Sequence, residues 1–169
     1  MKINIGCGHN KRKGFVGIDM YKTPATDMVV ELLQFPWPLE SDSVEEVYCE
    51  HFFERVPKEL RGKFMDELHR VMKFGAKATF ITACGDRALQ DARHEWPPIV
   101  AGSYLYFNKK WRIENQLQHG FYDLTADFDF SYAHALAPSI ADKDDEFKDF
   151  AVMHYNNAVN DLHAVLTKL

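Results

Sequence analysis

Apolar residues gather in short runs along the first half of the chain, and turn-forming residues separate each run from the next. Short runs of this kind, bounded by Gly, Pro, Asp or Ser, predict buried β-strands. The predicted strands are Lys2–Ile5, Phe15–Asp19, Met28–Leu32, Val44–Cys49 and Lys77–Ala83.

The apolar spacing becomes helical in two longer segments. Pro57–Met72 carries apolar residues on one face and charged residues elsewhere, with Pro57 suited to the first turn and Gly75 to a stop. Asp145–Leu169 is the second predicted helix. Its expected apolar face is formed by Phe147, Phe150, Ala151, His154, Ala158, Leu162 and Val165.

Strands that alternate with a helix predict an α/β fold with a mostly parallel, twisted sheet flanked by helices, in a single domain over residues 1–169. The stretch from Ile5 to Phe15 leaves little room for a crossover helix, so we expect a shortened N-terminal crossover. Ser103–Phe107 is aromatic and open to either element type, and Tyr122–Leu136 is predicted to hold one or two strands. In such sheets ligands bind at the carboxyl ends of the strands.

Three predicted strands end in residues that suit a nucleoside. Gly6-Cys7-Gly8 follows the first strand, and glycine allows a tight turn that a ligand can approach closely. Asp19 ends the second strand and can accept hydrogen bonds from a ribose diol. Glu31 near the end of the third strand can accept from an adenine amine. The alternatives are an ordinary tight turn and two solvated carboxylates.

The dinucleotide-binding pattern is incomplete. No GxxG completion follows Gly8, and Asp19 comes too soon after the turn. The short connection also offers little helix N-terminus for a pyrophosphate. These features favour a ligand that has ribose and adenine but no phosphate over NAD or FAD.

Six blocks occur in a fixed order over about the first 84 residues: INIGCG at 3–8, GFVGID at 14–19, VVEL at 29–32, FP at 35–36 with DSVEEVY at 42–48, EHFFERV at 50–56 and HRVMKFG at 69–75. Together they resemble the class I S-adenosylmethionine-dependent methyltransferases, especially short members of the type 11 group. The resemblance implies a Rossmann-like methyltransferase fold. Beyond residue 84 it is confined to Gln90–His94 and Tyr104–Trp111.

The resemblance implies S-adenosyl-L-methionine as cofactor, with S-adenosyl-L-homocysteine as product. The implied cofactor-binding residues are Gly6, Cys7, Gly8, Asp19, Glu31, Leu32, Glu50 and His51. Backbone groups at Gly6 and Gly8 would hold the methionine end, and Asp19 the ribose hydroxyls. Glu31, which replaces the family's usual aspartate, would accept from the adenine amine, with Leu32 beside the ring.

The resemblance places Glu50 and His51 near the sulfonium. A general base is needed only where the nucleophile must lose a proton, and histidine titrates near neutral pH. His51 and His94 are therefore the candidate catalytic residues, with Asp91 a candidate for orienting His94. The alternative is that both histidines are structural.

The acceptor is expected to be a small molecule or a sugar, by analogy with short members of the group. Amino-methyltransferases of DNA bases carry a D/N/S-P-P-Y/F motif after the fourth strand, whereas residues 49–52 read CEHF. The net charge of -5 also makes a nucleic acid an unfavourable partner. An acceptor pocket, or alternatively part of the core, is expected from Trp96, Tyr104, Tyr106, Phe107 and Trp111.

The three cysteines are widely spaced and form no CxxC pair, so the sequence predicts no metal site and no disulfide framework. Without an apolar run long enough to span a bilayer or a signal peptide, we expect a cytoplasmic protein with no membrane contact. It is predicted to be a monomer or a homodimer, with the terminal helix packed on the sheet or forming a dimer face.

Three further interpretations remain open at this point. The chain is alternatively a binding protein that holds S-adenosylmethionine without methyl transfer, or an enzyme that cleaves this cofactor. The third is a small nicotinamide-binding protein, which the missing third glycine disfavours.

Overall fold

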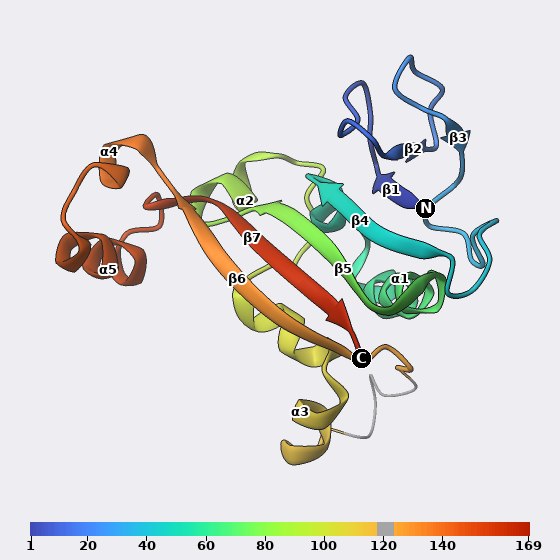
Figure 1. Cartoon of the computed structure of the whole chain (residues 1–169). Coiled ribbons are helices and arrows are strands. Elements are labelled where there is room, and N and C mark those ends of the chain that lie inside the picture. The colour runs from blue at the N-terminus through green and yellow to red at the C-terminus, as the bar shows by residue number, and fades with distance from the viewer. Residues whose placement is uncertain (118–123) are drawn as a thin grey trace.

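A computed structural model describes residues 1–117 and 124–169 as one seven-stranded sheet with the strand order β3-β2-β1-β4-β5-β7-β6 (Figure 1). The strands are β1 Lys2–Ile5, β2 Val16–Asp19, β3 Met28–Val29, β4 Val44–Glu50, β5 Met72–Ala83, β6 Phe128–Leu136 and β7 Val159–Lys168. Strands β1 to β5 pair in parallel, and β7 is antiparallel to both β5 and β6. The predicted α/β fold with a mostly parallel sheet is confirmed.

The helical elements are η1 Phe53–Arg55, α1 Lys58–Val71, α2 Asp86–Gln90, η2 Ala101–Phe107, α3 Lys109–Glu114, α4 Pro138–Ala141 and α5 Asp145–His154. The core between sheet and helices is aromatic. Phe53 lies 5.3 Å from Phe80 of β5 and 5.4 Å from Phe64 of α1, measured between ring centroids, and Tyr104 of η2 stacks on Phe53. All four rings are fully buried, which fixes the chain after β4 against the sheet.

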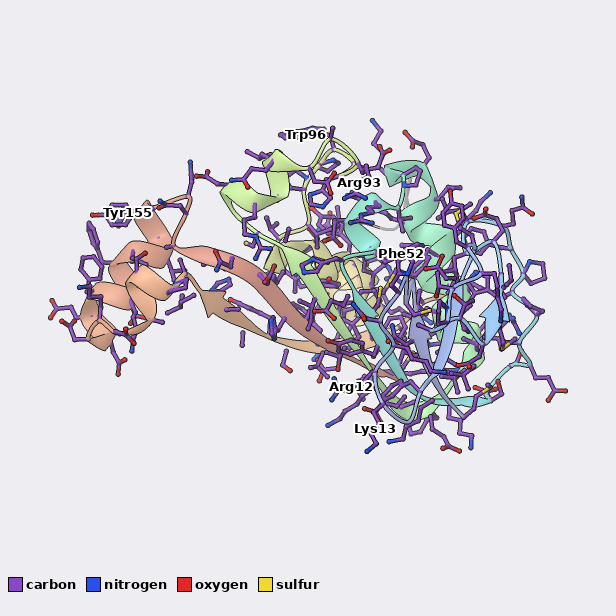
Figure 2. The ribbon with its side chains drawn as sticks, turned by 90° about the horizontal axis from the view of Figure 1, so that it is seen from above. Arg12, Lys13, Phe52, Arg93, Trp96 and Tyr155 are labelled. Atoms are coloured by element: carbon purple, nitrogen blue, oxygen red, sulfur yellow. The ribbon has the colours of Figure 1, made fainter. Side chains whose placement is uncertain are left out.

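The other face of the sheet is covered differently. On β4, Val47 and Cys49 are buried on the α1 side, and Tyr48 between them points to the opposite face. There the Arg12 guanidinium lies 4.7 Å from the centre of the Tyr48 ring. Figure 2 shows Arg12 and Lys13 across the sheet from α1. In the described part of the chain no helix joins β1 to β2, so the shortened crossover is confirmed.

Strand β3 is shorter than the predicted Met28–Leu32, because pairing with β2 ends at Val29. The chain then turns, and the amide of Gln34 donates to the carbonyl of Glu31 at 3.1 Å. Leu32 is still buried in the core. The apolar run therefore predicts burial correctly, although only part of it forms a strand.

Helix α1 ends at Val71, one residue before the predicted end at Met72, and the expected stop at Gly75 is wrong. Strand β5 begins directly at Met72, which pairs with Val44, while the next paired residue is Lys77. The residues between form an irregularity in which Gly75 has φ +72. Gly75 thus serves a bulge in a strand and not the end of a helix.

The predicted helix over Asp145–Leu169 is correct only in its first part. Helix α5 starts after Asp144, whose side chain accepts from the Phe147 amide, and it ends at His154. After a turn the chain forms β7, in which Leu162, Ala164 and Leu166 are buried alternately. Alternate burial is the period of a strand, so the helical spacing of His154, Ala158, Leu162 and Val165 was misleading.

The connection between β6 and β7 forms an arm that carries α4 and α5 away from β1, while β7 itself pairs with β5 (Figure 1). A second small core of Ala137, Ile140, Ala151 and Ala158 holds these helices together. The expected packing of the terminal helix on the sheet is therefore wrong. Of Tyr122–Leu136, residues 122 and 123 lie outside the described residues, and the rest holds one strand; Ser103–Phe107 belongs to η2. No helix in the described residues is both long and apolar enough to cross a membrane.

Candidate cofactor and acceptor site

The glycine turn after β1 is open on one side. Gly6 and Gly8 have φ +62 and +52, in the left-handed region that glycine adopts freely, and the Cys7 amide donates to the Ile18 carbonyl at 3.2 Å. A Cβ on Gly8 would meet no heavy atom within 4 Å, whereas a Cβ on Gly6 would lie 2.5 Å from the Phe52 ring. The space above Gly8 is thus free for a ligand.

Asp19 at the end of β2 lies directly beside this turn. Its Oδ2 accepts a 2.8 Å hydrogen bond from the Gly8 amide, and its Oδ1 accepts one of 3.0 Å from the Tyr21 amide. An ionised carboxylate offers about four acceptor positions. Two backbone amides leave capacity for a diol, so the residues present fit a ribose at this position.

The other predicted cofactor residues differ in what they present. Glu31 is half-buried, and its Oε1 accepts from the Leu33 amide at 3.2 Å. The side chain of Leu32 is in the core. The Cys7 thiol points to the Ala25 carbonyl, 3.7 Å away, and burial raises its pKa. Cys7 can therefore offer its backbone to a ligand, but its thiol is turned inward.

Strand β4 ends at Glu50, and His51 is the first residue after it. Glu50 is exposed, and its Oε2 accepts from the Tyr48 hydroxyl at 3.1 Å. His51 has φ +52, and its amide donates to the Ile81 carbonyl of β5 at 2.8 Å. The backbone therefore turns sharply at His51 and directs its ring toward the end of β5.

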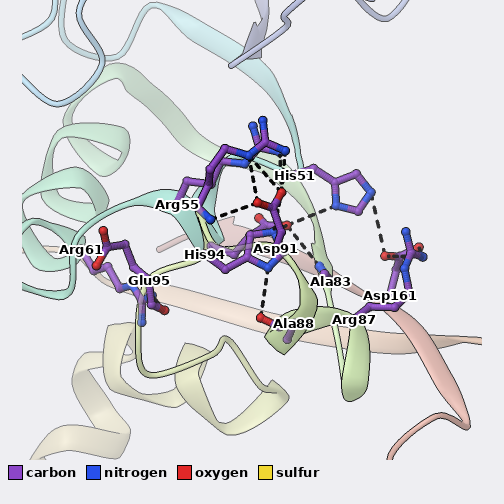
Figure 3. A network of polar contacts seen from close by, with 12 residues as sticks. His51, Arg55, Arg61, Ala83, Arg87, Ala88, Asp91, His94, Glu95 and Asp161 are labelled. Atoms are coloured by element: carbon purple, nitrogen blue, oxygen red, sulfur yellow. Dashed lines mark hydrogen bonds and ion pairs between the residues drawn. The ribbon is translucent and has the colours of Figure 1, made fainter.

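The ring of His51 (Figure 3) contacts the buried carboxylate of Glu54, for which the sequence predicted no role. Its Nδ1 lies 3.2 Å from Oε1 of Glu54, whose side chain is 2% exposed. This hydrogen bond raises the pKa of His51 despite partial burial. Burial alone would raise the pKa of Glu54, but hydrogen bonds from His51 and backbone amides, including that of Ala83, hold it below its usual value. The signal was the spacing of His51 and Glu54 within block 50–56.

His94 lies on the other side of Glu54. Its Nδ1 donates to the Ala88 carbonyl at 3.1 Å, which leaves Nε2 at 3.9 Å from Oε1 of Glu54 and 3.8 Å from Oδ2 of Asp91. Asp91 instead forms short hydrogen bonds with the Arg93 guanidinium, which lower its pKa. The carbonyl of Ala88 orients the His94 ring, and Asp91 is bound mainly to Arg93.

Both candidate histidines line one polar cavity of about 290 Å³. Its walls are His51, Arg55, Ala83, Arg87, Gln90, Asp91 and His94. Arg55 lies 3.7 Å from Asp91, and Arg87 lies 3.1 Å from Asp161 of β7. Figure 3 shows these ion pairs on either side of His51 and His94. The cavity is therefore rich in paired charges at the ends of β4 and β5.

The structure divides the aromatic residues that were expected to form an acceptor pocket. Tyr104 is in the core, and Trp96 is 71% exposed at the surface (Figure 2). Tyr106 and Phe107 line a second, mostly apolar hollow of about 320 Å³, and Trp111 packs on Tyr106. Its other walls are Phe53, Arg61, Pro97, Ile99 and Ser103.

The fold is similar to solved methyltransferases. A SAM-dependent methyltransferase from Archaeoglobus fulgidus matches with a TM-score of 0.62 and 13% identity, over 99% of this chain and 85% of that one. A second match is the geranyl diphosphate C-methyltransferase of Streptomyces coelicolor A3(2), solved in complex with Mg2+, geranyl diphosphate and S-adenosyl-L-homocysteine. Its TM-score is 0.53 and its identity 12%, over 99% of this chain and 72% of that one. An S-adenosylmethionine-dependent methyltransferase from Mesorhizobium loti matches with a TM-score of 0.52 and 12% identity, over 99% of this chain and 90% of that one.

No protein-family model matches the sequence, and no curated protein matches it. The likeness to solved structures therefore defines the fold and nothing finer. The chain has the Rossmann-like fold of the class I S-adenosylmethionine-dependent methyltransferases, as the sequence blocks predicted.

Proposed function

We propose that the protein is an S-adenosylmethionine-dependent methyltransferase that acts on a small-molecule or sugar-type acceptor. The observation that carries this proposal is the 2.8 Å contact between Gly8 and Asp19, which joins the ends of β1 and β2 beside open space. The similar geranyl diphosphate C-methyltransferase was solved with S-adenosyl-L-homocysteine, which supports the same cofactor here.

The chain's own groups would divide the cofactor between them. Backbone groups at Gly6, Cys7 and Gly8 would hold the methionine end, and the remaining lone pairs of Asp19 would accept from the ribose hydroxyls. Glu31 would accept from the adenine amine near Leu32. When bound, S-adenosylmethionine supplies an electrophilic methyl group on a positively charged sulfur.

The polar cavity at the end of β4 is the proposed acceptor site. Hydrogen-bonding and charged side chains dominate its lining, which suits a sugar or another polar molecule. His51, at its wall and next to Glu50, would accept the proton of a nucleophile, and His94 on the same wall would bind the acceptor. Asp91 would limit the cavity through its pairing with Arg93.

The chain's thiols support a reducing compartment, for which we propose the cytoplasm. Cys7, Cys49 and Cys84 are all free, and unpaired thiols are usual in cytosolic proteins. The acidic net charge of -5 supports an acceptor other than nucleic acid.

The test combines binding with product analysis. We expect S-adenosylmethionine and S-adenosylhomocysteine, but not NADH, to bind the purified protein in calorimetry. Mass spectrometry after incubation with pooled sugars and hydroxylated small molecules should then detect a product heavier by one methylene, together with S-adenosylhomocysteine. Binding without any methylated product would instead indicate a binding protein, and breakdown of the cofactor without transfer would indicate a cleaving enzyme. Failure of both sulfur nucleotides to bind would refute the proposal.

A further inference from the structure

One buried carboxylate connects the two histidines of the polar cavity. Oε1 of Glu54 lies 3.2 Å from His51 Nδ1, 3.2 Å from the Ala83 amide and 3.9 Å from His94 Nε2. Oε2 of Glu54 is buried and has no hydrogen-bond partner in the described part of the chain. A carboxylate taken out of water in this way needs a positive partner nearby.

We propose that Glu54 is a positioning residue that fixes the tautomer and the orientation of the His51 ring, so that His51 Nε2 removes a proton from an acceptor hydroxyl. This inference rests on the proposed function, and it names the acceptor class as a hydroxyl compound. Neither Glu54 nor its neighbour Ala83 needs to touch the acceptor for this role.

The tautomer follows from the donor and acceptor roles. An ionised carboxylate only accepts, so the nitrogen of His51 that faces Glu54 must carry a hydrogen. Nε2 of His51, which lies 3.9 Å from Asp161, then carries the lone pair. The same arrangement, a carboxylate behind a histidine, orients the base of the serine hydrolases.

The charged groups around His51 come from four elements. Glu54 of η1 faces Nδ1, and Asp161 of β7 lies 3.9 Å from Nε2 with Arg87 of α2 paired to it at 3.1 Å. Glu50 of β4 adds a more distant negative charge. These negative groups favour the protonated imidazole and so raise the pKa of His51. The ion pair with Arg87 weakens the effect of Asp161 at Nε2.

The proton balance of the step is simple. The acceptor O–H bond breaks, the proton forms a bond with Nε2 of His51, and the oxygen keeps the electron pair with which it attacks the methyl carbon. The carbon–sulfur bond breaks with its pair on sulfur, so the positive charge ends on His51. Glu54 at one nitrogen and Asp161 at the other then stabilise that charge.

A carboxylate with a merely structural role could be replaced by its amide. In Glu54→Gln the side-chain oxygen still accepts from the Ala83 amide, so the local fold is kept, but the negative charge is lost. We expect the pKa of His51, followed by NMR of labelled histidines, to fall by about one unit or more in Glu54→Gln. Glu54→Asp should keep most of the wild-type pKa.

Two further variants sharpen the NMR titration. Asp161→Asn acts at the opposite nitrogen and leaves η1 untouched, so it should lower the pKa of His51 by less, even if Glu54→Gln proved too unstable to study. Glu59→Gln, on the exposed first turn of α1, is the matched control and should leave His51 unchanged. An unchanged His51 in Glu54→Gln overturns the proposal. Where Glu54→Gln does not fold, NMR of the labelled ring nitrogens of wild-type His51 decides, and a neutral ring with its hydrogen on Nε2 overturns the proposal.

The second readout is the pH profile of methyl transfer. We expect the acidic limb of kcat to move down with the His51 pKa in Glu54→Gln, kcat on the plateau to fall at least tenfold, and the cofactor Kd to stay the same. A moved His51 pKa with an unmoved limb overturns the role in catalysis. If no acceptor is methylated by the wild type, the proposed function fails, while the NMR result still decides whether Glu54 controls His51.

Discussion

The carboxylate of Asp19 accepts a 2.8 Å hydrogen bond from the backbone amide of Gly8, which joins the end of β2 to the turn after β1. The two partners are eleven positions apart in the sequence and are brought together by the pairing of β1 with β2. The contact gives the turn a fixed negative group while leaving the space over Gly8 open. The first test of the site therefore falls on Asp19.

Asp19→Asn should weaken S-adenosylmethionine binding by about tenfold or more, that is by about 1.5–3 kcal/mol. The amide keeps the shape of the side chain but replaces one acceptor by a donor, which must face the Gly8 amide, the Tyr21 amide or the ligand. Calorimetric titration measures the effect, with the exposed strand residue Asp129→Asn as the control. Equal affinities in the two variants would remove Asp19 from the site.

Gly6→Ala should destabilise the protein more than Gly14→Ala. Both glycines have positive φ, so alanine at either costs about 1–2 kcal/mol of backbone strain. A Cβ at Gly6 would also lie 2.5 Å from the Phe52 ring, whereas one at Gly14 would meet nothing within 4 Å. We expect an additional loss of about 1–3 kcal/mol in urea denaturation for Gly6→Ala.

Phe52→Ala should relieve part of that additional loss. The ring atoms that resist a Cβ at Gly6 are then absent, but the Cβ of residue 52, at 2.7 Å, remains. A double-mutant cycle measured by urea denaturation gives the coupling directly. Strict additivity of the two substitutions would show that the ring simply moves aside.

Arg61→Ala should loosen the segment before the second hollow. The buried Arg61 guanidinium donates to the carbonyls of Val56, Glu95 and Pro97, and so ties α1 to the chain beyond α2. Losing these bonds should cost about 2–4 kcal/mol. Proteolysis near Pro97 should accelerate, whereas the exposed Lys58→Ala should leave both stability and cleavage unaltered.

The stabilising effect of His51 should depend on pH in a defined direction. Its pKa is raised in the folded protein, chiefly by Glu54, so its contribution is complete below the unfolded value of about 6.5 and disappears as pH rises through the folded value. The pKa of Glu54 is lowered, so its contribution is complete above its unfolded value and is lost as pH falls through the folded value. The loss of unfolding free energy in His51→Asn should thus be larger near pH 6 than near pH 9. A constant loss would contradict the charged pair.

The sequence predicts the elements whose signals are local. Helix α1 and strands β1 and β2 follow from spacing within each segment, because each buries one face or the whole of a short run. Strand β7 was predicted as helix because its apolar residues fit a helical spacing as well as an alternating one. Only pairing with β5 and β6 selects the strand.

The same limit applies to the site. The strand ends bring Gly8 and Asp19 together as predicted, since parallel strands of one sheet end at one edge. Glu54 lies three residues from His51, but its spacing alone gave it no role, because its other partners Ala83 and His94 are remote in the sequence and only the folded chain brings them to one carboxylate. The aromatic residues 96–111 divided between core and surface because their spacing carries no clear period.

The arm between β6 and β7, which carries α4 and α5, has a small apolar core of its own. Ala137, Ile140, Ala151 and Ala158 share no member with the main core, and small side chains bury little apolar area. Amide hydrogens in α4 and α5 should therefore exchange with solvent by local opening, whereas those in β5 should exchange only on global unfolding. Motion at the tip of the arm would then cost the remainder of the protein almost nothing.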